Sequence, residues 1–135
     1  MIGLPSISIY ISTKFALEGF TESLSYELAS QNIVVKLVEP GGGDTAFHAR
    51  ALKLNTGDGG LDSYDPFLER ANAALGKLGK RMATPERIAA VIYGAVTDGT
   101  KRLRYAAGDD VKHFVEARRK LSDEDYENFM RAQFA

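Results

Sequence analysis

The sequence predicts an α/β fold in which helices flank a doubly wound parallel sheet. The order of elements runs helix, strand, helices, strand, helices, which is typical of that fold class. The run from Ile33 to Val38 is apolar on both faces, as buried parallel strands are. It stops at Pro40 and three glycines, which are residues that interrupt strands. Two strands alone form a marginal sheet, so the sheet is expected to be incomplete.

A long helix is predicted from about Ser12 to Ser30, and Gln31–Asn32 ends it. Four large apolar side chains fall within one arc of the helical wheel and are expected to face the core. They are Leu17, Phe20, Leu24 and Leu28.

Further helices and a second strand are predicted downstream. One helix is predicted from Asp65-Pro66 to about Lys77 and another from Thr84-Pro85 to near Asp98–Gly99, and both open on an N-cap residue followed by proline, which is a typical helix start. Residues 101–108 alternate apolar and basic side chains, as a short strand does. The charged tail from Asp110 onward is predicted to be helical, and Ser122 with Asp125 forms a capping box for its last helix.

The composition excludes several classes of function. The 135 residues carry a formal net charge of -1, so nucleic acid and anionic membranes are not expected partners. The chain has no cysteine, which rules out disulfides and thiolate metal sites. Its longest apolar runs are about six residues, against about 20 for a membrane span. With no basic leader after Met1, we expect a cytoplasmic location.

Tyr10 and Lys14 are the first candidates for chemistry. They lie four residues apart and share one face of the predicted helix. An ammonium one turn away favours the phenolate and lowers the pKa of a tyrosine, and the positive helix end acts in the same direction. The pair therefore suits proton transfer. A Tyr/Lys pair on a solvated helix surface has the same spacing, so the motif alone is weak evidence.

The stretch from Gly3 to Thr45 resembles the short-chain dehydrogenase/reductase family. The matching features are Gly3-Leu4-Pro5, Tyr10-x-x-x-Lys14 with Thr13 before the lysine, Ala16, Leu24, Glu27, Leu28, and Val35-x-x-Val38-x-Pro40-Gly41 leading to Thr45. Residues 84–108 are similar to the family's last helix and last strand. The resemblance covers nearly the whole chain but only the second half of the family pattern, so it implies the C-terminal part of a Rossmann-like sheet.

The resemblance implies an NAD(P)-dependent oxidoreductase that interconverts an alcohol and a carbonyl. In the family the tyrosine, here Tyr10, exchanges a proton with the substrate oxygen. The lysine, here Lys14, lowers the tyrosine pKa and holds the nicotinamide ribose. Pro40, Gly41 and Thr45 match the turn that approaches the cofactor. Gly43 departs from the β-branched residue usual in that turn, and the choice between NAD and NADP stays open.

Two parts of the family pattern are absent from these residues. No strand leads into a Gly-rich turn that could cradle the dinucleotide pyrophosphate. The glycines at 57–60 lack a preceding strand, and Ser6 and Ser8 are out of register for the family's catalytic serine. Residues 1–135 are therefore expected to form one incomplete domain that is inactive alone, with residues 44–83 as the candidate substrate lid.

The alternative is a non-enzymatic truncated chain that acts as an association or regulatory module.

A second apolar stripe on the first helix, formed by Phe15, Gly19 and Tyr26, lies on nearly the opposite face from the core arc. It predicts a homo-oligomer with this stripe in an isologous contact. His48 and His113 lack ligand spacing, so no metal site is expected.

Overall fold

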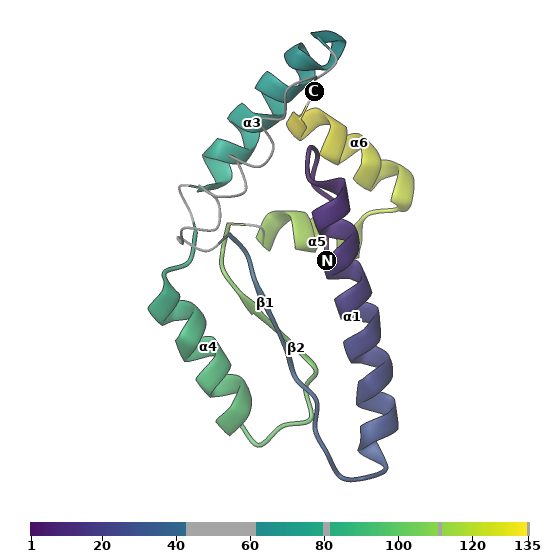
Figure 1. Ribbon diagram of the computed structural model, residues 1–135, viewed down its shortest axis with the longest axis vertical. Coiled ribbons are helices and arrows are strands. Elements are labelled where there is room, and N and C mark those ends of the chain that lie inside the picture. The colour runs from purple at the N-terminus through teal and green to yellow at the C-terminus, as the bar shows by residue number, and fades with distance from the viewer. Residues whose placement is uncertain (43–61, 80–81, 111, 135) are drawn as a thin grey trace.

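The computed structural model describes residues 1–42, 62–79, 82–110 and 112–134. Two short parallel strands, β1 (Leu37–Pro40) and β2 (Arg104–Ala107), form the sheet. The helices α1 (Ser8–Ala29) and α4 (Pro85–Thr97) flank the strand pair (Figure 1). This arrangement confirms the predicted α/β class with a parallel sheet between helices.

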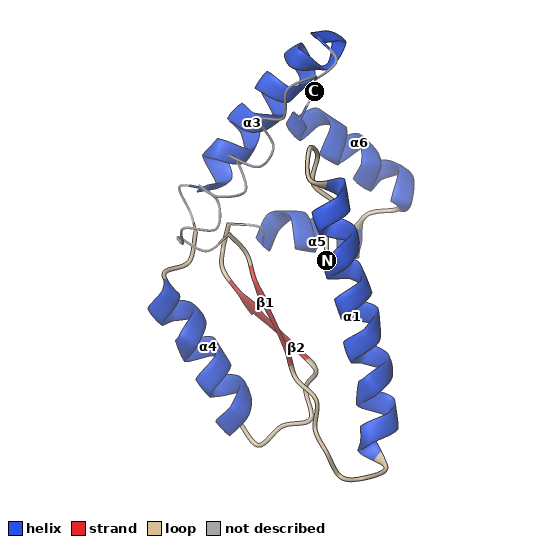
Figure 2. Cartoon of the chain, viewed as in Figure 1, coloured by secondary structure: helices blue, strands red, loops and turns tan. Residues whose placement is uncertain are grey.

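The sheet is shorter than the sequence predicted, and its first strand begins later. β1 starts at Leu37 rather than Ile33, and it pairs with β2 from Leu37↔Arg104 to Pro40↔Ala107. A strand needs a hydrogen-bonded neighbour, and β2 offers one for only four residues. Figure 2 shows the two strands side by side between the helices.

α1 begins at Ser8, four residues before the predicted start, so Tyr10 lies in its first turn. Asn32 ends the helix in a left-handed conformation, with φ 56°. The Ile33 amide then donates to the Leu28 carbonyl at 3.1 Å, which caps the last turn.

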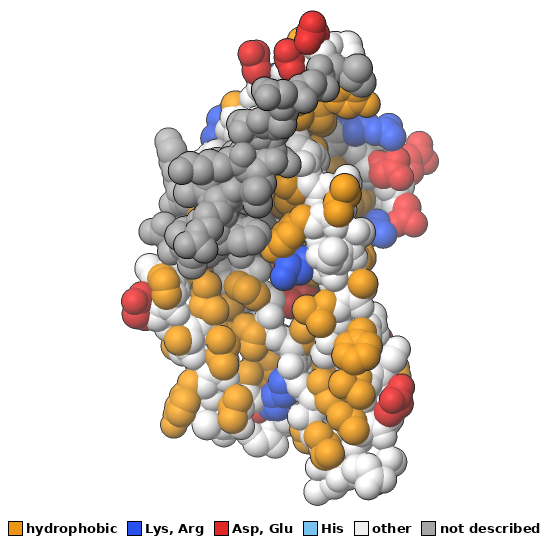
Figure 3. Space-filling model, in the orientation of Figure 1, with side chains coloured by type: hydrophobic (Ala, Val, Ile, Leu, Met, Phe, Trp, Pro, Cys, Tyr) orange, Lys and Arg blue, Asp and Glu red, His pale blue; other side chains and the backbone are white. Residues whose placement is uncertain are grey.

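The predicted core arc of α1 is wrong for Leu17 and Phe20, whereas Leu24 and Leu28 are half-buried. Leu17 and Phe20 are 50% and 64% exposed, and α1 contains no buried residue. Its sheet-facing side instead carries Glu18 and Glu22, which both pair with Arg104 of β2. Charge pairs with β2 therefore line the sheet side of the helix, and the described residues cover its apolar arc only in part, at Leu24 and Leu28. Figure 3 shows apolar side chains gathered on one face over α1 and α4.

A separate apolar core joins the two ends of the chain. Ile2, Phe114 and Phe134 are buried together, and Phe114 lies on α5 (Lys112–Lys120) while Phe134 ends α6 (Asp123–Phe134). Ala74 and Leu75 pack against this cluster from α3 (Asp65–Gly79), which follows the short 3-10 helix η1 (Asp62–Tyr64).

Two predicted helix caps are confirmed. The Thr84 side chain accepts a hydrogen bond from the Arg87 amide at 3.3 Å, with Pro85 as the first residue of α4. Before α6, the Asp125 amide donates to the Ser122 hydroxyl at 3.1 Å, and that hydroxyl donates to the Asp125 carboxylate. No helix among the described ranges is long and apolar enough to cross a membrane.

A polar network closes the end of the sheet at which both strands begin. Lys36 Nζ donates to Asp98 Oδ1 at 2.6 Å and to the Tyr105 hydroxyl at 2.9 Å. The Tyr105 hydroxyl donates to Asp98 Oδ2 at 2.6 Å. The Lys36 ammonium and the Tyr105 hydroxyl hold the pKa of Asp98 well below its ordinary value of 3.8. The network joins the start of β1, the end of α4 and β2.

Asp98→Asn is expected to lower the stability of the chain at neutral pH and to lose that effect in acid. Because its folded-state pKa is depressed, Asp98 contributes stability above its unfolded pKa, and that contribution is lost as the pH falls. The difference in urea midpoint between the wild type and Asp98→Asn should therefore shrink between about pH 5 and about pH 2. Asp109→Asn, in an exposed ion pair with Arg87, is the control. A pH-independent difference for Asp98→Asn would contradict the assignment.

Candidate functional site

Tyr10 and Lys14 occupy the first two turns of α1 and share one face. Lys14 Nζ lies 5.2 Å from the centroid of the Tyr10 ring, and the Tyr10 side chain is 40% exposed. No acidic residue lies in the first turn, and Ile7 provides no side-chain cap. The positive end of the helix is therefore not offset by its own side chains and favours negative charge beside Tyr10.

The Pro40–Gly42 turn follows β1 at its carboxyl end. The Gly41 amide donates to the Ala107 carbonyl at 3.1 Å, which extends the β1–β2 pairing by one residue. The Gly42 amide donates a hydrogen bond to the Asp110 carboxylate, and the Gly42 carbonyl accepts one from the Ala83 amide. In open α/β sheets ligands bind beyond the carboxyl ends of the strands, so the turn lies where a ligand is expected.

The structure brings the two halves of the candidate site to the same end of the sheet. The start of α1 lies level with the carboxyl ends of β1 and β2 (Figure 1). The terminal ammonium of Met1 lies 3.6 Å from Glu39 Oε1 of β1, which links the segment before α1 to the last residues of that strand. The expected cofactor residue Thr45 lies outside the described residues, as do Gly43 and His48.

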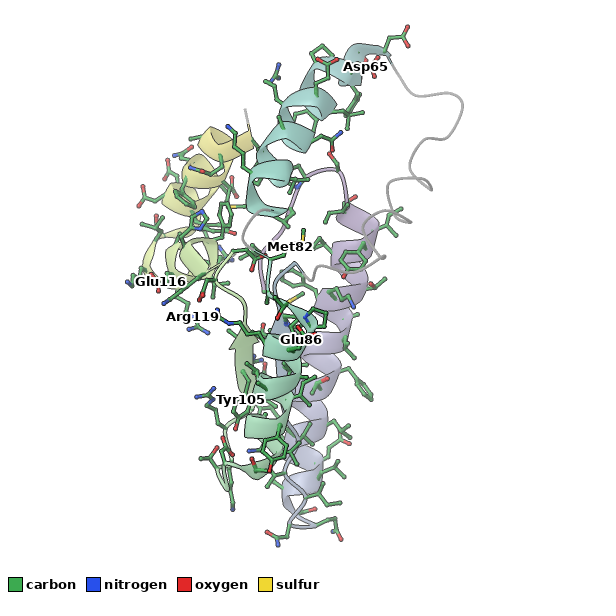
Figure 4. The ribbon with its side chains drawn as sticks, turned by 90° about the vertical axis from the view of Figure 1, so that its left-hand side faces the viewer. Asp65, Met82, Glu86, Tyr105, Glu116 and Arg119 are labelled. Carbon is green, nitrogen blue, oxygen red and sulfur yellow. The ribbon has the colours of Figure 1, made fainter. Side chains whose placement is uncertain are left out.

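The candidate lid is described only in part. Residues 62–79 form η1 and α3, and Phe67 of α3 is half-buried. Met82, which precedes α4, lies against the turn. A Cβ added to Gly42 would be 2.8 Å from the Met82 Cγ. Figure 4 shows Met82 just before α4 and Glu86 in the first turn of that helix. One end of the lid segment therefore borders the Pro40–Gly42 turn.

Sequence reasoning missed Asp110. Its side chain is 2% exposed, and its Oδ2 accepts a hydrogen bond from the Gly42 amide at 2.6 Å. The preceding residues Gly108-Asp109 do not indicate this contact, because an Asp after a strand usually lies in a solvated turn. A carboxylate that reaches back to the end of another strand is visible only in three dimensions.

The residues present fit one end of a nicotinamide dinucleotide. The exposed Lys14 ammonium and the Tyr10 hydroxyl are donors suited to ribose hydroxyls and to a substrate oxygen. A pyrophosphate site needs a strand, a Gly-rich turn and a helix start in succession, and no helix in the described ranges begins in that way. No cluster of three metal-ligating side chains occurs in the described ranges. His113 packs its ring 3.8 Å from that of Phe114.

Comparisons with known proteins agree with the family resemblance. Residues 1–54 match the family model described as short chain dehydrogenase. An uncharacterized oxidoreductase of Schizosaccharomyces pombe is 34% identical over 116 residues, covering 85% of this chain and 47% of the relative. The uncharacterized oxidoreductase YusZ of Bacillus subtilis is 34% identical over 114 residues, covering 83% and 41%.

A shorter match is closer in identity. Estradiol 17-beta-dehydrogenase 1 of Rattus norvegicus is 44% identical over 73 residues, which cover 54% of this chain and 19% of the relative. The chain spans less than half the length of each of these relatives.

Proposed function

We propose that this chain, which is related to the short-chain dehydrogenase/reductase family, is the catalytic half of an NAD(P)-dependent oxidoreductase that interconverts an alcohol and a carbonyl. The observation that carries the proposal is the Tyr10–Lys14 pair, with Lys14 Nζ 5.2 Å from the Tyr10 ring. The Pro40–Gly42 turn at the same end of the sheet supports it, as do relatives that are oxidoreductases.

The chain's own residues would handle the proton and the ribose. When bound, the nicotinamide supplies the hydride. Tyr10 gives its hydroxyl proton to the substrate oxygen in reduction and takes it back in oxidation. Lys14 stabilises negative charge on the Tyr10 oxygen and donates hydrogen bonds to the ribose hydroxyls. Pro40, Gly41 and Thr45 are proposed to shape the wall beside the nicotinamide.

This chain alone is expected to bind NADH and NADPH weakly, with a Kd above about 1 mM, because the pyrophosphate cradle is missing. Fluorescence titration of either nucleotide measures this affinity. The matched comparison is a hybrid protein. In this hybrid, the part of the Schizosaccharomyces pombe relative that this chain does not match is joined ahead of residue 1. The hybrid should bind one nucleotide at micromolar concentration and oxidise or form it. Micromolar binding by the isolated chain would contradict the expectation.

A second candidate function is association, and the exposed faces of α1 favour it. Phe15 and Tyr26 are 47% and 68% exposed, and a Cβ built on Gly19 meets no atom within 4 Å. The Tyr26 hydroxyl donates to Glu22 at 2.7 Å, and Glu22 pairs with Arg104, so the ring is held in place. A close-approach glycine between two exposed aromatic rings, one of them held by a hydrogen bond, suits an isologous contact with a second copy.

Replacing both Phe15 and Tyr26 by Glu is expected to convert an oligomeric hybrid into monomers. Two carboxylates brought against their symmetry mates oppose association by desolvation and repulsion. Sedimentation velocity measures the change, and circular dichroism verifies folding. Phe15→Glu alone leaves the Tyr26–Glu22 hydrogen bond intact and should weaken the contact in part. Tyr93→Glu, on an exposed position of α4, is the control. An unchanged oligomer in the double variant would reject the stripe as the interface.

A further inference from the structure

Asp110 is the only charged side chain that is buried within the described ranges. It follows β2 by three residues and is 2% exposed. Its Oδ2 accepts a hydrogen bond from the Gly42 amide at 2.6 Å. Its Oδ1 makes no hydrogen bond within the part of the chain that the structure describes. A buried carboxylate with an oxygen that has no partner among the described residues is costly for a fold, and such a group calls for an explanation at its own location.

The Asp110 carboxylate fills space that two glycines leave empty. A Cβ added to Gly41 would collide with the carboxylate, and one added to Gly108 would lie 2.7 Å from Asp110 Oδ1. Gly108 also has φ 147°, a conformation that favours glycine. The carboxylate therefore fits between the ends of β1 and β2 because neither neighbour has a side chain.

Three segments hold the turn after β1. The Gly41 amide donates to the Ala107 carbonyl at 3.1 Å, and the Gly42 amide donates to Asp110. The Gly42 carbonyl accepts from the Ala83 amide at 3.2 Å, just before α4. We call this set of five residues the turn clamp: Gly41, Gly42, Ala83, Ala107 and Asp110. Its contacts fix both polar backbone groups of Gly42 without any ligand.

We infer that Asp110 is a positioning residue that fixes the Pro40–Gly42 turn for nicotinamide binding, an inference that rests on the proposed function. The turn lies at the carboxyl end of β1, and a β-branched side chain that would stiffen it is lacking at Gly43. The Asp110 carboxylate restrains the turn from the adjacent strand. A turn ordered before binding avoids the entropy cost of ordering it with the ligand.

The first test measures the Gly42 amide in this chain by hydrogen exchange with NMR detection. Asp110→Ala removes the acceptor and is expected to speed Gly42 exchange at least about tenfold. The Leu37 amide, bonded to the Leu103 carbonyl at the other end of β1, should be unaffected. Asp110→Asn keeps an acceptor oxygen and should restore part of the protection. Asp109→Asn, which changes the exposed ion pair with Arg87, should leave the exchange rate of the Gly42 amide as in the wild type.

The second test separates nucleotide binding from turnover in the hybrid. Asp110→Ala is expected to raise the KM for the nucleotide about tenfold while kcat changes less than about threefold, since the turn acts on binding and Tyr10 on proton transfer. Asp110→Asn should lie between Asp110→Ala and the wild type.

Specific outcomes would overturn the inference. These are unchanged Gly42 exchange in both Asp110 variants, equal acceleration at Leu37, or equal losses in kcat and kcat/KM. If Asp110→Ala does not fold, the same measurements are made on Asp110→Asn: hydrogen exchange at the Gly42 and Leu37 amides, and the change in nucleotide KM compared with the change in kcat. If the wild-type hybrid binds nucleotide without turning over, the proposed function fails, whereas amide exchange and nucleotide affinity still decide the inference.

Discussion

Tyr10→Phe is expected to reduce kcat of the hybrid by about 100-fold or more, because the variant removes the group proposed to exchange the proton. The phenylalanine ring keeps the shape of the tyrosine, and Tyr10 is 40% exposed in the chain, so folding should be unaffected. Nucleotide affinity should change less than about threefold, since binding and proton transfer are separate steps. Stopped-flow reduction of a carbonyl substrate with NADH or NADPH measures the rate.

Two comparisons make the Tyr10 result specific. Tyr93→Phe removes a hydroxyl from a 72% exposed tyrosine on α4 and should leave kcat unchanged. Lys14→Met removes the ammonium that lies 5.2 Å from the Tyr10 ring and should lower kcat and raise the nucleotide KM together, because one ammonium is proposed to serve both. Ordinary turnover in a folded Tyr10→Phe hybrid would reject the proton-transfer proposal.

Local signals in the sequence were sufficient for the fold class and several element ends. The Thr84–Pro85 and Ser122–Asp125 patterns predicted helix starts that the structure has, because an N-cap depends on residues within one turn. Asn32 ended α1 for a similarly local reason, since asparagine tolerates the left-handed conformation. The parallel pairing of β1 and β2 followed from the order of elements.

Features set by distant residues were not predictable. The helical wheel assigned Leu17 and Phe20 to the core, but the pairing of Glu18 and Glu22 with Arg104 turns another side of α1 toward the sheet. The strand predicted from Ile33 begins at Leu37 because β2 is only four residues long. The spacing of Tyr10 and Lys14 could be read from the sequence. The hydrogen bond from the Gly42 amide to Asp110 could not, because it joins residues 68 apart.

Phe114→Ala is expected to lower the free energy of unfolding of this chain by about 3–5 kcal/mol. This loss is large, because the free energy of unfolding of a typical domain is about 5–15 kcal/mol. Phe114 is 2% exposed, with ring centroids 6.1 Å from Phe134 and 5.9 Å from Phe129. It belongs to the same buried cluster as Ile2. Truncation would leave a cavity where α5, α6 and the N-terminal segment meet. Urea denaturation followed by circular dichroism gives the free energy.

The matched control is Phe20→Ala, which removes the same side chain from a 64% exposed position on α1. In this chain the change should cost less than about 1 kcal/mol, because truncating an exposed side chain returns little apolar surface to water. In the hybrid, if the added half covers the apolar arc of α1, the same change should cost about 3 kcal/mol or more. Equal small costs in both proteins would show that the added half leaves the arc open. A loss below about 1 kcal/mol for Phe114→Ala would show that the C-terminal helices do not depend on this cluster.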